Sequence, residues 1–160
     1  MSGDESAIAS RIRAELADLE RVAQRADRLF SKLQEQNDED YLDGVALNLH
    51  GFYAGIERIF EAIARDIDDS LPTGPEWHRD LLMQMSAEMS NTRPPVIGRQ
   101  TRDCLDEYRG FRHVVRNVYT FNLKPSRLQE LVEELPSCYA ALVQDVTTFC
   151  DFLDKLASEE

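Results

Sequence analysis

The chain has 160 residues, enough for one domain with a substantial core, and its hydrophobic fraction of 42% excludes a wholly disordered protein. Its formal net charge of −12 at pH 7 excludes nonspecific nucleic-acid binding over the whole surface. No apolar run approaches the roughly 18 residues that span a bilayer, and the first residues lack the basic and apolar regions of a signal peptide. We therefore expect a soluble cytoplasmic protein with one domain over residues 1–160.

Hydrophobic periodicity predicts helices along the whole chain. Apolar residues recur every three or four positions, and nothing alternates with period two for long enough to form a strand. The expected helices, in chain order, cover about residues 4–36, 38–69, 75–89, 99–120, a short helix from 125, and a long helix from 136 to 157. The first two form an antiparallel hairpin, with Asp38 capping the second. Pro125 and Pro136 are expected at first helical positions, where the missing N–H costs nothing. The fold class is all-α, a bundle of five to six helices.

The cysteines and most histidines carry no recognisable metal or catalytic pattern. Cys104, Cys138 and Cys150 are an odd number with wide spacing and no CxxC, so we expect buried small hydrophobic residues in a reducing cytoplasm, with neither a disulfide framework nor a zinc site. His50 and His78 are expected to be structural. No metal site, cofactor or phosphate-binding glycine loop is indicated.

Positive charge is concentrated in one segment. Residues 93–127 hold eight basic and three acidic residues, giving +5, whereas the other 10 basic and 27 acidic residues give −17. A polyanion would be attracted to this segment and repelled elsewhere. The alternative is that the segment contacts an acidic surface, either of a partner or of a second copy of the chain.

A helical wheel separates the fourth expected helix into two faces. With Arg112 at zero, an apolar arc at about 200–300° should face the core, and a polar arc runs from about 340° to 140°. The apolar arc contains Cys104, Phe111, Val114, Val115 and Val118, and the polar arc contains Arg109, Arg112, His113, Arg116, Asn117 and Tyr119. Closely spaced guanidinium groups favour a bound anion, and phosphate suits their planar geometry. The alternative is a solvated helix face.

Residues 111–119, FRHVVRNVY, resemble the signature of the HEPN superfamily, specifically the HepT-type toxins. That signature is an Arg, a polar residue, a short spacer, a His, any residue and a Tyr. Arg112, His113 and Tyr119 match it. Residues 49–60, the pair Trp77-His78, residues 93–95 and the break at 135–136 also look like HepT-like proteins, so the resemblance covers most of the chain.

The resemblance implies a metal-independent RNA endonuclease that is the toxin of a toxin–antitoxin pair. It gives Arg112 the task of stabilising phosphoryl charge, with Arg109, His113 and Arg116 supporting RNA binding. The motif His, however, falls at Asn117, which cannot exchange a proton near pH 7. Loss of a general acid or base costs about 10²- to 10⁴-fold in rate, so catalysis by this chain should be weakened or absent.

Several readings of Asn117 stay open. The chain is either a degenerate family member or carries a selected change that permits production of a toxic nuclease. His113, one turn away, is a third option as a substitute. The resemblance also implies a homodimer and a nucleotidyltransferase antitoxin of the MntA type, which would attach AMP to Tyr119. The alternative function is a non-catalytic protein that binds nucleotide, RNA or a protein partner.

Overall fold

The computed structural model describes residues 2–117 and 123–159, except for the side chains of residues 2, 3, 116 and 117. Over this part of the chain it consists of α-helices and connecting loops, with one isolated bridge between Met89 and Arg93. The five helices are α1 (Ser2–Gln36), α2 (Asp40–Asp66), α3 (Trp77–Met85), α4 (Arg99–Asn117) and α5 (Pro125–Glu159). The predicted all-α bundle is confirmed.

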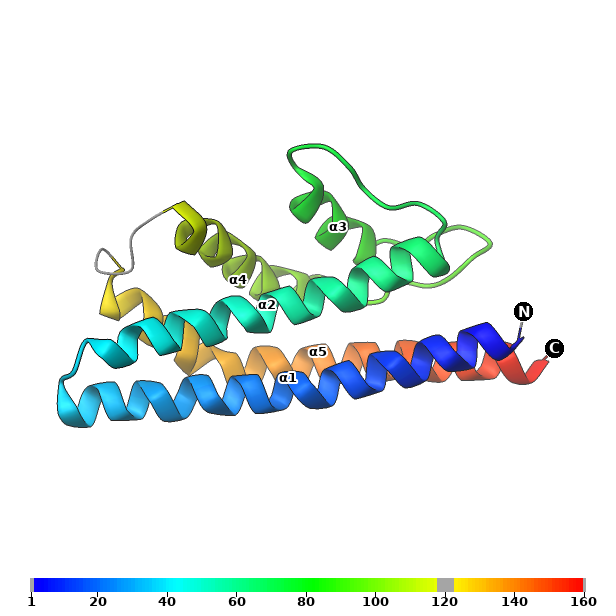
Figure 1. The fold of residues 1–160 in the computed structure, drawn as a ribbon. Helices are drawn as coiled ribbons and strands as arrows, with labels where there is room; N and C mark the ends of the chain where they lie inside the picture. The colour runs from blue at the N-terminus through cyan, green and yellow to red at the C-terminus, as the bar shows by residue number, and fades with distance from the viewer. Residues whose placement is uncertain (1, 118–122, 160) are drawn as a thin grey trace.

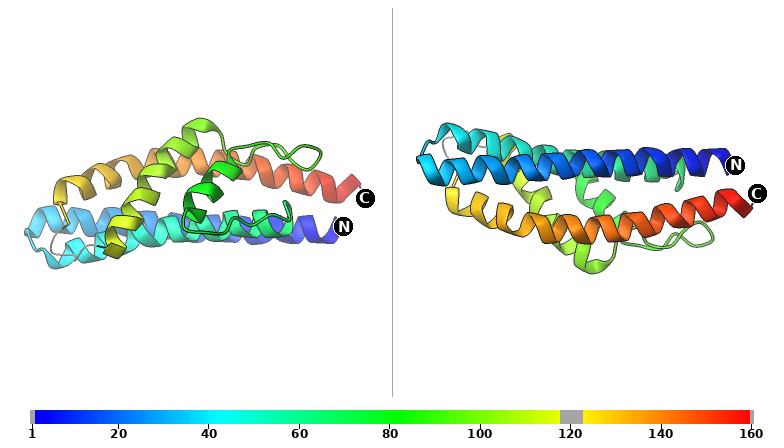
Figure 2. Two further views of the ribbon diagram at one scale, coloured as in Figure 1. Left: turned by 90° about the horizontal axis from the view of Figure 1, so that it is seen from above. Right: turned by 90° about the horizontal axis from the view of Figure 1, so that it is seen from below.

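Three long helices form the body of the molecule. α1 packs against both α2 and α5, while α3 and α4 lie on the side of α2 that faces away from α1 (Figure 1). α4 crosses over α2 and α5, and the N-terminal end of α1 lies near the C-terminal end of α5 (Figure 2). α1 and α5 have 35 residues each, so each is about 50 Å long at 1.5 Å per residue.

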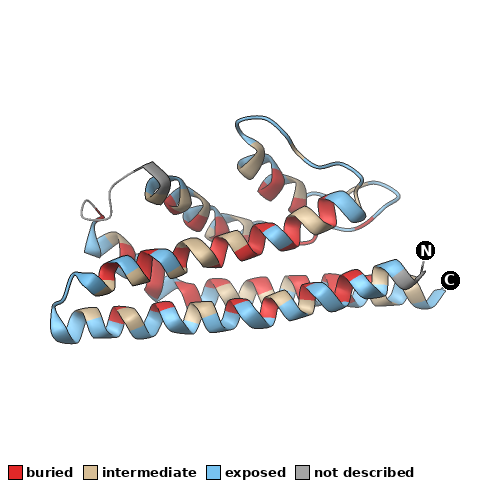
Figure 3. Cartoon of the chain, viewed as in Figure 1, coloured by how far each residue is buried: buried red, intermediate tan, exposed pale blue. Residues whose placement is uncertain are grey.

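The core follows the apolar stripes that the sequence predicts. Buried residues run along the inward faces of α1, α2 and α5 and along the undersides of α3 and α4 (Figure 3). Phe52, Tyr53, Ile56 and Phe60 of α2 are fully buried because α2 lies between α1 and the α3–α4 pair. The predicted cap of α2 was one residue off. The N-cap is Glu39, which makes no capping hydrogen bond with its side chain, while the Asp38 carboxylate accepts a hydrogen bond of 2.9 Å from the Asp40 N–H in the turn.

Two helix boundaries differ from the prediction. Pro136 does not open a separate helix but lies inside α5, which continues through it. Burial of Val132 and Leu135 beside it holds the helix together despite one missing hydrogen bond. α3 is shorter than predicted because Arg93 donates to the carbonyl groups of Gln84 and Ala87 at its end, at 3.2 and 2.8 Å.

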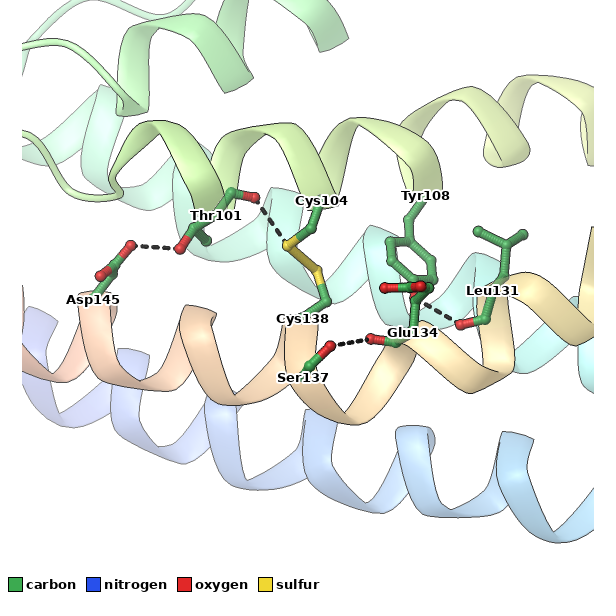
Figure 4. The surroundings of a disulfide bond; sticks show 8 residues. All are labelled: Thr101, Cys104, Tyr108, Leu131, Glu134, Ser137, Cys138 and Asp145. Atoms are coloured by element: carbon green, nitrogen blue, oxygen red, sulfur yellow. Dashed lines mark hydrogen bonds between the residues drawn. A yellow bond between two sulfur atoms is a disulfide. The ribbon is translucent and has the colours of Figure 1, made fainter.

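The expectation of three unpaired cysteines was wrong. Cys104 of α4 and Cys138 of α5 form a disulfide (Figure 4), with their Cα atoms 5.9 Å apart. That separation lies within the range that disulfides require. The bond joins two helices that meet only in the fold, so no local motif reveals it. Cys150 is a buried thiol, as predicted, and burial raises its pKa to about 11.

Further bonds attach α4 to α5 on both sides of the disulfide. The Asp145 carboxylate accepts hydrogen bonds from the Thr101 hydroxyl at 2.6 Å and from the Gly98 N–H at 2.9 Å. One turn beyond the disulfide, the buried Tyr108 hydroxyl donates to the Leu131 carbonyl at 2.7 Å. Figure 4 shows the Thr101–Asp145 and Tyr108–Leu131 hydrogen bonds on either side of the disulfide. α4 is therefore fixed at its N-terminal half, ahead of the arginines on its later turns.

None of the helices in the described part of the chain combines the length and the apolar character needed to cross a membrane.

Candidate functional site

A cleft of about 660 Å³ lies between the start of α3 and the middle of α4. Its wall is made by the segment 74–79 on one side and by three side chains of α4 on the other. The α4 residues are Arg109, Arg112 and His113. Together with Arg79, they give the cleft three guanidinium groups and one imidazole, and Glu76 is the carboxylate among its lining residues. A concave surface lined by several guanidinium groups is a candidate site for an anionic ligand.

A buried carboxylate lies beneath this basic cleft. Glu57 sits on the apolar face of α2, one turn after Tyr53, and its side chain is 4% exposed. An acidic group is almost never buried to this extent unless it is paired. Its partners come from α3 and α4, so Glu57 connects the elements that form the cleft.

Glu57, His78 and Arg112 form one cluster. His78 Nδ1 lies 2.6 Å from Glu57 Oε2, and Arg112 Nε lies 3.8 Å from Glu57 Oε1. A carboxylate can only accept, so Nδ1 carries the proton that is shared with Glu57. Arg112 Nη1 lies 3.1 Å from His78 Nε2 and 3.4 Å from Nδ1. These nearly equal distances place the guanidinium over the imidazole face rather than in its plane.

Trp77 covers His78 as well. The two ring centroids are 3.6 Å apart, and the planes are inclined by 31°. Since the indole and the guanidinium cannot occupy the same space, the imidazole lies between them. Trp77 packs against the core and also lines the cleft. The ring of His78 is held on both faces and at one nitrogen.

Arg112 faces inward rather than outward. Leu105, Tyr108 and Phe111 are buried, so the core arc of α4 runs from about 260° to 20° on the wheel and includes Arg112. The predicted core position of Val114 was wrong, since this side chain is 41% exposed. Arg112 can face the core because Glu57 supplies a counter-charge for its guanidinium, which is 19% exposed.

Two polar atoms at the cluster lack hydrogen-bond partners within the described part of the chain. They are Arg112 Nε and the Tyr53 hydroxyl, both of which are buried. Burial raises the pKa of Tyr53 far above its usual range, and the negative charge of the nearby Glu57 carboxylate raises it further. Unsatisfied polar groups of this kind are rare in folded proteins. Their occurrence here distinguishes the floor of the cleft from the ordinary core.

Not all of the basic segment is available to an anion. The guanidinium of Arg93 is fully buried and makes a bidentate ion pair with Asp68 at 2.6 and 2.8 Å. Arg127 pairs with Glu107 at 2.7 Å and Glu130 at 3.1 Å. The surplus positive charge of residues 93–127 that is available to an anion is therefore smaller in the fold than in the sequence. At the cleft, Arg109 and Arg112 also have carboxylate partners, Asp106 and Glu57.

The predicted site residues divide into two groups. Arg109, Arg112 and His113 line the same cleft, and Arg109 forms an ion pair with Asp106 at 2.7 Å. Arg116 and Asn117 belong to the last turn of α4, but their side chains lie outside the part that the structure describes. Tyr119 lies outside the described residues altogether.

Sequence reasoning missed His78, Glu57 and Arg79. His78 was expected to be structural, yet it lines the cleft and contacts both Glu57 and Arg112. One signal was available, since Glu57 is an acidic residue within the apolar stripe of α2. The position of α3 against α4 carries no sequence signal, so the cluster becomes visible only in the fold.

Comparison with protein families identifies a relationship for this chain. A family model described as HepT-like protein matches residues 44–153, which is well over half of the chain and includes all of α3 and α4. Searches of the curated proteins and of the solved structures gave no match.

Proposed function

Because the chain belongs to the HepT-like family, we propose that it is the toxin component of a toxin–antitoxin pair and that it binds and cleaves RNA. The observation that carries this proposal is the basic cleft, which gathers Arg79, Arg109 and Arg112 in a protein of net charge −12. Guanidinium groups bind phosphate oxygens in pairs and give affinity independently of base sequence. The phosphodiester backbone of RNA fits such a surface.

Within this proposal, Asn117 weakens catalysis without removing binding. An amide can donate to or accept from a phosphate oxygen, but it does not exchange a proton near neutral pH. Arg112 stabilises the phosphoryl group, and Arg109, His113 and Arg116 hold the RNA. A second copy of the chain, in a homodimer, would bring another such helix to a shared cleft.

The Asn117→His variant tests the catalytic assignment. We expect it to cleave RNA about 10²- to 10⁴-fold faster than the original chain, because it restores a group that can accept a proton. The measurement is growth on induction, with RNA integrity read from the same cultures and cleavage rates from purified proteins. The matched control is Asn48→His, at a half-buried position of α2 that is not among the cleft-lining residues.

Equal rates for the original chain and Asn117→His would contradict the catalytic assignment. If RNA is nevertheless bound at the cleft, the chain is a non-catalytic binding protein of the same family. Regulation is proposed to act at Tyr119, where an MntA-type nucleotidyltransferase would attach AMP. On the helical wheel Tyr119 falls near Arg112 and Arg116, so a phosphate attached there would compete with RNA for the same guanidinium groups.

A further inference from the structure

His78 has the surroundings of a histidine that transfers a proton. Its Nδ1–H donates to a carboxylate that is 4% exposed, and its own side chain is 20% exposed at the wall of the cleft. A carboxylate in this position fixes the tautomer and leaves the lone pair on the second nitrogen, Nε2. No described carboxylate other than that of Glu57 contacts the ring.

Arg112 Nη1 is within hydrogen-bonding distance of Nε2, at 3.1 Å, but it approaches from the ring face and not along the in-plane lone pair. The guanidinium lies over the ring face, as its similar distances to both ring nitrogens require. A cation in this position can hold a phosphate group while the edge of the imidazole meets the adjoining ribose. Trp77, packed on His78, limits rotation of the ring. The three side chains thus give a base, its orientation and a phosphate ligand within one cleft.

We propose that His78, oriented by Glu57, is the group that accepts the proton of the ribose 2′-hydroxyl in this chain. The proposal rests on the proposed function, since it requires RNA in the cleft. It gives the cleft a general base that does not depend on position 117. His78 is thus a catalytic residue, and Glu57 is a positioning residue that acts through it.

The step balances with water as the second proton source. The 2′-O–H bond breaks, the proton moves to His78 Nε2, and the released electron pair forms the bond from the 2′ oxygen to phosphorus. The bond from phosphorus to the 5′ oxygen breaks, and that oxygen takes a proton from solvent water. The hydroxide formed then removes the proton from His78. The products are a 2′,3′-cyclic phosphate and a 5′-hydroxyl end.

The test compares purified variants on a labelled single-stranded oligoribonucleotide, with cyclic-phosphate ends and RNA binding measured in parallel. We expect slow but measurable cleavage by the original chain. His78→Ala should lower this rate by about 10²- to 10⁴-fold while RNA is still bound. Added imidazole should restore part of it, which a purely structural histidine would not allow. His50→Gln, on α2 and not among the cleft-lining residues, is the matched control.

Glu57→Gln separates orientation from general stability. It should lower the rate about tenfold or more when His78 is present, because the charged partner of Nδ1 is lost. It should lower the imidazole-rescued rate of His78→Ala by a smaller factor, since a diffusing imidazole is not held by Glu57 and only the loss of the Arg112 counter-charge remains. An effect only through Arg112 would lower both rates equally and would overturn the positioning role.

The remaining outcomes decide between the two proposals. Cleavage by Asn117→His with none by the original chain overturns the assignment of His78 and leaves the proposed function standing. Loss of cleavage in His113→Gln but not in His78→Ala also overturns it. If neither the original chain nor Asn117→His binds or cleaves RNA, the proposed function fails and the inference fails with it.

Discussion

Replacement of Asp68 by alanine should destabilise the protein by about 3–5 kcal/mol, because it leaves a buried guanidinium without its counter-charge. The side chains of Asp68 and Arg93 are both 0% exposed, so water cannot replace the lost carboxylate. Gln84 also donates to Asp68 at 2.8 Å, and this contact fixes the end of α3. The loss is a large part of the 5–15 kcal/mol that typically stabilises a domain.

Urea denaturation followed by circular dichroism measures this effect. The matched control is Asp18→Ala, which removes an ion pair with Arg21 between side chains that are 66% and 83% exposed. That change should cost less than about 0.5 kcal/mol. A loss below about 1 kcal/mol for Asp68→Ala would contradict the burial of this ion pair. Asp68→Ala should also make the cleft less well ordered, because α3 carries His78 and Trp77.

Removal of the disulfide should lower the free energy of unfolding by about 3 kcal/mol. Cys104 and Cys138 are 34 positions apart, so the bond restricts a long loop of the unfolded chain. The double variant Cys104→Ser/Cys138→Ser should therefore unfold at a lower denaturant concentration than the oxidised protein. Since the bond attaches α4 to α5, the site helix should also exchange its amide hydrogens faster.

A reductant supplies the control for this prediction. It should lower the denaturation midpoint of the original chain toward that of the double variant and leave the double variant unchanged. Cys150 does not interfere at neutral pH, because burial raises its pKa to about 11 and the thiolate is the form that exchanges. Equal stability of the oxidised and reduced chains would contradict a disulfide that constrains α4.

The hydrophobic periodicity was sufficient to predict where most helices lie along the chain, but not which helices contact one another. The apolar stripes of residues 4–36 and 38–69 predicted α1 and α2 closely, because a helix face that packs on a core needs a repeat near 3.6. Pro136 misled the prediction, since tertiary packing of its neighbours outweighs one lost hydrogen bond. The disulfide could not be predicted, since it depends on where α4 crosses α5.

The candidate site was predicted in part for the same reason. Arg109, Arg112 and His113 share one helix, so their spacing alone placed them near one another. Glu57 and His78 come from two other helices, and their meeting with Arg112 depends on how α3 and α4 pack on α2. The helical wheel also placed Arg112 on the outward, polar face. Its inward position depends on the counter-charge of Glu57, which lies 55 positions earlier in the chain and does not enter the wheel.

RNA binding at the cleft is the central claim, and fluorescence anisotropy with a labelled oligoribonucleotide over a range of salt concentrations tests it most directly. The double variant Arg79→Ala/Arg109→Ala removes two cleft charges and leaves the Glu57–Arg112 pair intact. The control Arg21→Ala/Arg25→Ala makes the same charge change on exposed positions of α1. The account predicts tight, salt-dependent binding by the original chain and the control, and weaker binding by the cleft variant, whose salt slope falls by about 1 per arginine. Equal binding by the two double variants, or no binding by the original chain, would contradict it.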